Sequence, residues 1–142
     1  MAISLSPSTW NSLGLGVAAT WAALGLAGGL RPAAAADLFG ITALGSGGRG
    51  DGKSGADRDS MIGFAGVLGS RDMTIALTLL YLGRAGRNAD MGAVILSTMT
   101  ITAVDIWLVW RKKKGFNSEL GVLTVGSLIW AVIGFGLRGH FD

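Results

Sequence analysis

The feature that most constrains this chain is the stretch Met61–Leu82, which reads MIGFAGVLGSRDMTIALTLLYL and carries Arg71 and Asp72 at its middle. A helix of this length measures about 33 Å, enough to cross a hydrocarbon core of roughly 30 Å. A charge near the centre of a spanning helix costs about 2.5 to 3.5 kcal/mol, so both side chains should face a protein interior and find partners there. We therefore expect the other helices of the chain to surround Arg71 and Asp72.

Three further apolar runs cover residues 10–30, 91–110 and 120–137, and half of the chain is hydrophobic. Together with residues 61–82 they predict an all-α, four-transmembrane-helix bundle that forms a single domain over residues 1–142. The run 10–30 could instead be a secretory signal, with Ala34–Ala36 as its cleavage site. We expect an uncleaved spanning helix, because the run is long for a signal and no basic residue precedes it.

A glycine-rich loop covers residues 45–56, and we expect it to be poorly ordered. Within it, Gly47, Gly52, Lys53 and Ser54 match the P-loop pattern GxxxxGK[ST]. A phosphate-binding P-loop joins a buried strand to a helix, whereas the sequence around this match predicts a surface loop and a membrane helix. We interpret the match as a chance product of the many glycines.

Basic residues are divided unevenly between the two sides of the predicted bundle. The loops after the first and third helices hold eight of them, Arg31, Arg49, Lys53, Arg58 and Arg111 to Lys114, and the other side holds three, Arg84, Arg87 and Arg138. The positive-inside rule places the richer side in the cytoplasm. Both termini of this multi-pass protein are then expected on the lumenal or exterior side, with the endoplasmic reticulum as a candidate membrane.

Composition limits the chemistry that the chain could perform. The sequence contains no cysteine, and its one histidine, His140, lies two residues from the end. We therefore expect no metal centre and no cofactor. The net charge of +3 is modest and is explained by membrane topology, so we expect no nucleic-acid partner. The expected partners are the lipid bilayer and a lipophilic small molecule, and self-association into a homo-oligomer remains open.

Arg71, Asp72 and Asp105 are the candidate catalytic residues. Neighbours in a helix point about 100° apart, so we expect Arg71 and Asp72 to reach different partners. Asp105 lies about five residues, or roughly 7 Å, beyond the centre of helix 91–110, on the side toward which Arg71 should lean. This offset predicts an ion pair between Arg71 and Asp105 across the second and third helices.

The predicted pair could be a lock that holds the bundle together, or it could mark a functional site. Ionisable groups inside membranes so often mark sites that we favour function. Eight hydroxyl residues could complete a polar interior: Thr74, Thr78, Ser97, Thr98, Thr100, Thr102, Thr124 and Ser127. Trp107 could line the apolar part of the pocket as a substrate-binding residue, or it could anchor the helix at the membrane surface.

The order of these features resembles that of a family of small four-helix integral membrane proteins of unknown function, found in fungi and some bacteria. The likeness rests on Leu38-Phe39-Gly40 in the first loop, on a GxRD-type segment with Gly69, Arg71 and Asp72, and on Asp105 with Trp107. It spans residues 10–135, although the loop 45–55 departs from the family pattern. Some fungal relatives look like accessory members of natural-product pathways, which implies an enzyme that acts on a lipophilic intermediate.

The function that we expect is cofactor-free acid/base catalysis on a lipophilic molecule, by an isomerase, an epoxide-opening enzyme or a cyclase. A carboxyl group shielded from water can keep its proton at neutral pH, so Asp72 is the expected acid. Asp105 is the expected ionised partner, and Arg71 holds Asp105 or binds a developing oxyanion. The alternatives are a proton or small-molecule transport component and a scaffold subunit of a membrane complex.

The charge bias makes a prediction about topology. Single cysteines placed at Ser46 and at Ser6 would be labelled in intact membranes with an impermeant thiol reagent added from outside. Position 6 should react and position 46 should not, because the loop with more basic residues is expected in the cytoplasm. The reverse pattern would contradict the predicted orientation.

Overall fold

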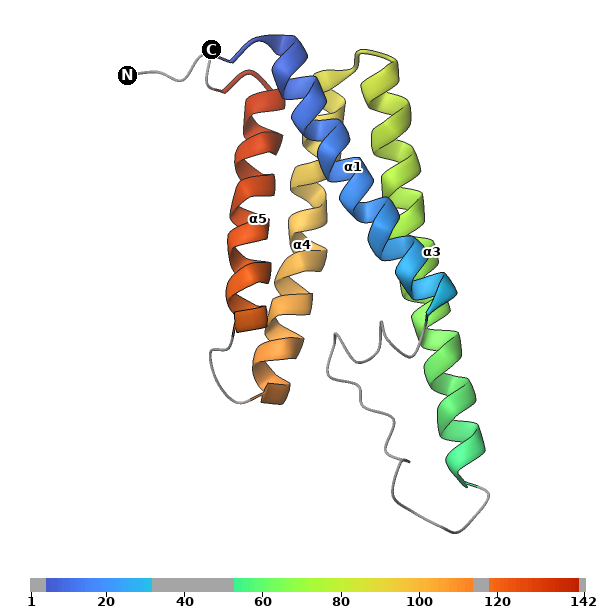
Figure 1. The fold of residues 1–142 in the computed structure, drawn as a ribbon. Coiled ribbons are helices and arrows are strands. Elements are labelled where there is room, and N and C mark those ends of the chain that lie inside the picture. Colours follow the sequence, from blue (N-terminus) through green and yellow to red (C-terminus); the bar gives the residue numbers. More distant parts are fainter. Residues whose placement is uncertain (1–4, 32–52, 114–117, 141–142) are drawn as a thin grey trace.

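The computed structural model of the chain describes residues 5–31, 53–113 and 118–140, with the backbone alone for 53–62, 65, 112–113 and 118–119. The helices are α1 (Pro7–Leu30), α3 (Lys53–Arg84), α4 (Asn88–Lys113) and α5 (Ser118–Leu137). Successive helices run in opposite directions along the bundle (Figure 1). The described residues contain no strand, and the predicted all-α four-helix bundle is confirmed.

The helices extend beyond the apolar runs that predicted them. In α1, the N-cap Ser6 accepts a hydrogen bond from the backbone N–H of Thr9 at 3.2 Å, and a proline occupies the first turn. The helix therefore starts at Pro7, before the apolar run at residue 10. A hydropathy pattern finds the apolar residues of a helix, whereas capping decides where the helix begins.

The largest boundary difference lies at the start of α3. The helix begins at Lys53 rather than at Met61, so residues 53–56 are helical and the prediction of a loop reaching residue 56 was wrong there. A helix can continue from the membrane into water, where its polar residues are solvated and hydropathy no longer marks it. Residues 45–52, with the expected disorder and the glycines of the P-loop match, lie outside the described residues.

The helices form two tight pairs, α1 with α3 and α4 with α5, and α3 contacts α4 much less. Glycines allow the first close approach. A Cβ atom added to Gly69 would lie 2.9 Å from the carbonyl oxygen of Gly25, and one added to Gly25 would lie 2.9 Å from the backbone nitrogen of Met73. The two backbones therefore touch directly, as small residues permit in membrane helix packing.

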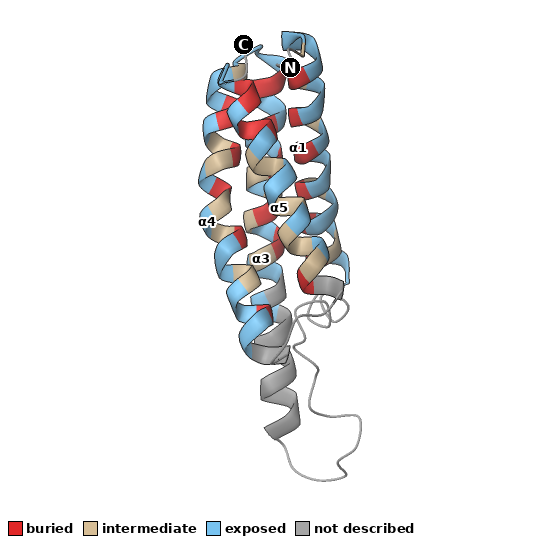
Figure 2. Ribbon diagram, turned by 90° about the vertical axis from the view of Figure 1, so that its left-hand side faces the viewer, coloured by how far each residue is buried: buried red, intermediate tan, exposed pale blue. Residues whose placement is uncertain are grey.

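Both ends of the described chain meet at one end of the bundle, which we call the terminal end. There the Asn88 side chain donates a hydrogen bond to the Pro7 carbonyl at 3.4 Å, and the Trp10 ring packs against Gly136. The opposite end holds Leu30, Lys113 and Ser118 (Figure 1). Buried residues follow the inner sides of the helices, and exposed residues cover the outside (Figure 2).

The composition of the core changes along the bundle axis. Toward the terminal end it consists of large apolar side chains, among them Leu79, Met91 and Ile95, which are fully buried. The buried polar residues of the described part are Asp72, Thr98 and Thr102, which lie farther from that end. The polar part of the core is therefore confined to one region of the bundle.

Among the described residues, three helices are long and apolar enough to cross a membrane: α1, residues 88–111 of α4, and residues 120–137 of α5. The described part of α3, which was predicted as a fourth spanning helix, is not among them. Large apolar side chains also cover the outer surface, with Val67, Val122 and Leu128 each more than half exposed. A water-soluble monomer rarely presents so much apolar surface, whereas a lipid-embedded bundle requires it. The chain is therefore a membrane protein.

The packing register corrects the expected depth of the charges in α3. Gly25 lies beside Gly69 and Met73, so Arg71 is level with Gly25. Gly25 is about five residues, or roughly 8 Å, past the centre of the apolar run 10–30. Arg71 and Asp72 are therefore nearer the opposite end than the middle of their own apolar run suggested, because α3 is displaced along the bundle relative to α1.

The close approach of α1 and α3 predicts unequal effects of alanine at two glycines one turn apart. Gly69→Ala should destabilise the bundle by about 1 to 3 kcal/mol, since the added methyl group meets the α1 backbone. Gly66→Ala is the matched control, because a Cβ there has no neighbour within 4 Å. Unfolding in mixed micelles measures both variants, and equal stability would contradict the register.

Candidate functional site

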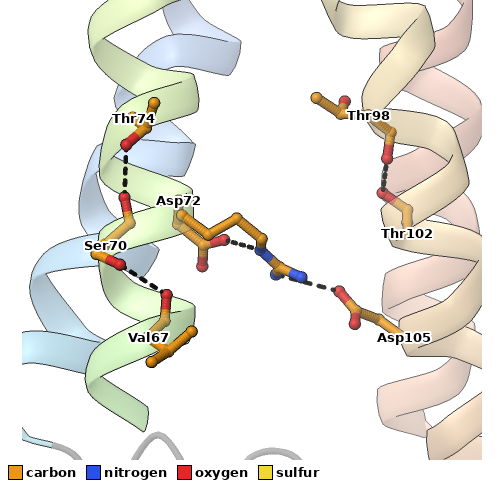
Figure 3. A network of polar contacts seen from close by, with 8 residues as sticks. Val67, Ser70, Asp72, Thr74, Thr98, Thr102 and Asp105 are labelled. Carbon is orange, nitrogen blue, oxygen red and sulfur yellow. Dashed lines mark hydrogen bonds and ion pairs between the residues drawn. The ribbon is translucent and has the colours of Figure 1, made fainter. Parts of the chain in front are cut away.

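Arg71 joins the two aspartates across the space between α3 and α4. Its Nε donates a hydrogen bond to Oδ1 of Asp72 at 2.9 Å, and its Nη2 lies 3.7 Å from Oδ2 of Asp105. Figure 3 shows Asp72 and Asp105 on facing helices, with dashed lines marking these contacts. The predicted contact between Arg71 and Asp105 is therefore present.

The expectation that Arg71 and Asp72 would reach different partners was wrong. The angle of about 100° between neighbouring residues fixes the directions of their first side-chain bonds. It does not fix the guanidinium, which sits at the end of a long flexible stem and folds back over Asp72. One arginine therefore serves both carboxylates, and the contact with its neighbour is the shorter one.

Helical periodicity explains why these residues meet. Asp72 belongs to the inward stripe of α3 with Gly69, Ala76 and Leu79, all buried. On α4, Asp105 follows Ile95, Thr98 and Thr102 at spacings of three and four residues, the same spacing that keeps side chains on one face. Both aspartates thus occupy inward-facing positions of a helix, in a stripe that faces the partner helices.

Two of the eight predicted hydroxyl residues, Thr98 and Thr102, are buried beside this network. Thr98 donates its hydroxyl to the carbonyl of Ile95 at 2.7 Å, and Thr102 donates to the carbonyl of Thr98 at 3.2 Å. Four others, Thr74, Thr78, Ser97 and Thr100, are exposed, and Thr124 and Ser127 are half-buried. The polar interior is thus smaller than predicted.

Burial and charge differ among the members of the network. The side chain of Asp72 is 9% exposed, that of Asp105 is 19% exposed and that of Arg71 is 31% exposed. With both carboxylates ionised the network carries a formal charge of minus one, so a single proton would make it neutral. Asp72 is thus the most buried member of the network, and Arg71 is the most exposed.

Trp107 is separate from the network. Its side chain is about half exposed, and the Arg111 guanidinium lies over its ring at 5.3 Å from the centroid. Two residues along a helix correspond to about 200° of rotation, so Trp107 and Asp105 point to opposite sides of α4. This placement favours the alternative of an anchor at the membrane surface, where Trp is enriched.

Trp21 is a polar feature of the interior that the sequence analysis missed. It is 3% exposed, packs against Trp130 with ring centroids 5.2 Å apart, and its indole N–H has no acceptor among the described residues. Its position in the sequence could have identified it as an interior residue, because a tryptophan in the middle of an apolar helix is not at the membrane surface. It lies one turn from Gly25, toward the terminal end.

A cavity of about 410 Å³ opens at the terminal end, away from the charged network. It is lined by Pro7, Trp10, Gly86 to Asp90 and Gly136 to Gly139. None of Arg71, Asp72, Asp105 or Trp107 contributes to it. Three charged residues line it: Arg138, and Arg87 and Asp90, which form an exposed ion pair at 2.6 Å.

The fold and the network define a small helical membrane protein with an ion-paired arginine between its helices. Residues 18–137 match the family described as Domain of unknown function (DUF4267), and the chain belongs to this family. This agrees with the resemblance to an uncharacterised family, and the match includes Trp21, Arg71, Asp72 and Asp105. No curated protein and no solved structure matches the chain.

The shared arginine predicts an asymmetric mutant cycle. Arg71→Leu should cost more than Asp105→Asn, because it leaves two carboxylates without their cation, whereas Asp105→Asn leaves Arg71 paired with Asp72. Combining them should recover part of the loss, with a coupling energy of about 0.5 to 3 kcal/mol. Stability would again be measured by unfolding in mixed micelles.

Two outcomes would contradict this arrangement. Strict additivity would mean that Arg71 and Asp105 do not interact, and a larger cost for Asp105→Asn would mean that Asp105 has a partner other than Arg71. Asp90→Asn is the control, since it breaks the exposed pair with Arg87 at the terminal end and should cost at most about 1 kcal/mol.

Proposed function

We propose that this chain binds a lipophilic small molecule at Arg71, Asp72 and Asp105 and performs cofactor-free acid/base chemistry on it. The observation that carries the proposal is the arginine held between two carboxylates of unequal burial on two helices. Isomerisation, epoxide opening and cyclisation all need an acid and a base that act on one molecule without an external redox partner. The site contains both kinds of group.

In this proposal Asp72 is the acid and Asp105 is the base. A protonated carboxyl group can give up its proton from one oxygen while the other oxygen still accepts the N–H of Arg71. The contact between Arg71 Nε and Asp72 Oδ1 is therefore compatible with a proton on Oδ2. Arg71 holds Asp105 in its ionised form and stabilises negative charge that develops on the substrate.

The surroundings support a lipophilic substrate. The network connects α3 to α4, one of the helices apolar enough to cross a membrane, and its neighbours Thr98 and Thr102 donate their hydroxyl protons to backbone carbonyls. A molecule dissolved in the bilayer could reach Arg71, because part of its side chain is exposed. We extend the proposal to biosynthesis, which the resemblance described from the sequence implies.

We also propose the orientation and the membrane. The excess of basic residues in the loops after the first and third helices supports a cytoplasmic location for those loops. Both termini then lie in the lumen or outside the cell, and the endoplasmic reticulum suits a biosynthetic protein of this kind. The network would lie nearer the cytoplasmic surface than the bilayer centre.

Proton transport is the second candidate. It is favoured by the charge of the network, which has two carboxylates for one arginine and can therefore take up and release a proton. Intramembrane carboxylates paired with basic groups occur in proton relays. Purified protein in liposomes with an internal pH-sensitive dye would show proton flux that Asp72→Asn abolishes, whereas an enzyme would show none.

The catalytic proposal predicts a specific loss of turnover. Asp72→Asn keeps the shape of the side chain but cannot supply a carboxyl proton, so conversion should fall by about 10² to 10⁴. Lipid extracts of cells expressing the wild type, Asp72→Asn or the control Asp90→Asn would be compared by mass spectrometry. An isomerase or cyclase yields a product with the mass of its precursor, and epoxide hydrolysis adds one water.

Folding must be monitored in the same membranes, by the yield and unfolding of each variant. A folded Asp72→Asn protein with full conversion would eliminate Asp72 as the acid. A fully active Arg71→Leu/Asp105→Leu double variant would reduce the network to a structural role.

A further inference from the structure

The cavity at the terminal end lies where the candidate membrane spans end. Its volume of about 410 Å³ is within the usual range for small-molecule sites. Each of the three spans found in the described residues has one end residue in the cavity lining, namely Pro7, Asn88 and Leu137. Figure 1 shows the start of α1, the start of α4 and the end of α5 at this same end of the bundle. Because spanning segments end at the membrane surface, the cavity lies at the level of the lipid head groups.

The lining of this cavity carries a positive charge that the described residues do not neutralise. Arg87 is paired with Asp90, with its Nε 2.6 Å from Oδ2. Arg138 lines the same cavity, is exposed, and forms no ion pair or side-chain hydrogen bond within the described part of the chain. Two arginines and one aspartate give the lining a formal charge of plus one. Electrostatics therefore favours an anionic ligand at Arg138.

The surface next to Arg138 favours an anion that carries a hydrocarbon chain. Three large, exposed apolar side chains precede it on α5, at successive spacings of three, three and four residues: Phe135, Val132 and Leu128. Residues at these spacings share one face of a helix, and ten residues of helix extend about 15 Å. An acyl chain attached to an anion at Arg138 could lie along this face, whereas a free anion would leave it uncovered.

We propose that this cavity binds the head group of a phospholipid, with Arg138 donating hydrogen bonds to the phosphodiester oxygens and an acyl chain lying along α5. A guanidinium suits this role because its N–H groups can bind two oxygens of one phosphate and its charge does not titrate. The phosphodiester is also the anionic group that phospholipids place at this level of a bilayer. The inference goes beyond the proposed function, since none of Arg71, Asp72 and Asp105 lines the cavity.

The test counts lipids bound to the full-length protein by native mass spectrometry, after purification in detergent. The probes are phosphatidylglycerol, the diacylglycerol with the same acyl chains, the fatty acid of the same chain length, and the soluble head group glycerophosphoglycerol. Phosphatidylglycerol should remain bound at concentrations at which the other three do not. Diacylglycerol lacks the phosphate, the fatty acid offers a carboxylate instead, and the soluble head group lacks the acyl chains.

A matched pair of variants locates the binding. Arg138→Gln should weaken phosphatidylglycerol binding by about tenfold or more, because it removes the charged donor. Arg84→Gln is the control, since Arg84 is an exposed arginine at the same end of the bundle that does not line the cavity. It removes the same charge and should change binding by less than about twofold.

Four outcomes would overturn the inference. Equal binding of diacylglycerol would mean that the acyl chains alone decide, and equal binding of the fatty acid would mean that any anionic amphiphile fits. Equal binding of the soluble head group would identify a free phosphodiester rather than a lipid as the ligand. Equal weakening by Arg84→Gln and Arg138→Gln would reduce the effect to general charge attraction. If Arg138→Gln does not fold, the comparison of the four probes on the wild-type protein still decides.

Discussion

The need to neutralise a charged arginine between apolar helices governs this structure. Arg71 cannot lie there alone, and the two carboxylates that accompany it come from its own helix and from α4. Because α3 and α4 contact each other little, this network is a main contact between those two helices, while α1 joins the two tight pairs through its own contacts with α5 and α4. A contact made of charges is costly to maintain compared with apolar packing, and this cost is the reason for proposing that the network has a function.

The glycine contact between α1 and α3 determines where that network lies. Backbone touches backbone at Gly25 and Gly69, so α3 cannot slide or rotate against α1 without a clash. Asp72, three residues after Gly69, is thereby held on the inward stripe of α3, and Arg71 is turned toward α4. Small residues thus supply the precision that a site needs, since a rigid helix pair presents its polar groups at a fixed depth.

The sequence predicted the helices and the pair of Arg71 with Asp105 because both follow from hydropathy and helical spacing. It could not predict that Arg71 also binds Asp72, since spacing describes where side chains start and a flexible guanidinium ends elsewhere. It missed the start of α3 at Lys53, because polar helical turns carry no apolar pattern. It also missed Trp21, whose unpartnered indole N–H depends on which residues the other helices bring to it.

The asymmetry of the network is what makes acid/base chemistry physically reasonable there. Two equivalent carboxylates around one arginine would share their proton equally and offer neither a defined acid nor a defined base. Here one carboxyl group is more buried and accepts a hydrogen bond from Nε, whereas the other is more exposed and meets the guanidinium at a longer distance. Environments that differ in this way assign different protonation states to chemically identical groups. In the chemistry that we propose, the helix packing that separates Asp72 from Asp105 in depth is therefore also what would separate the acid from the base.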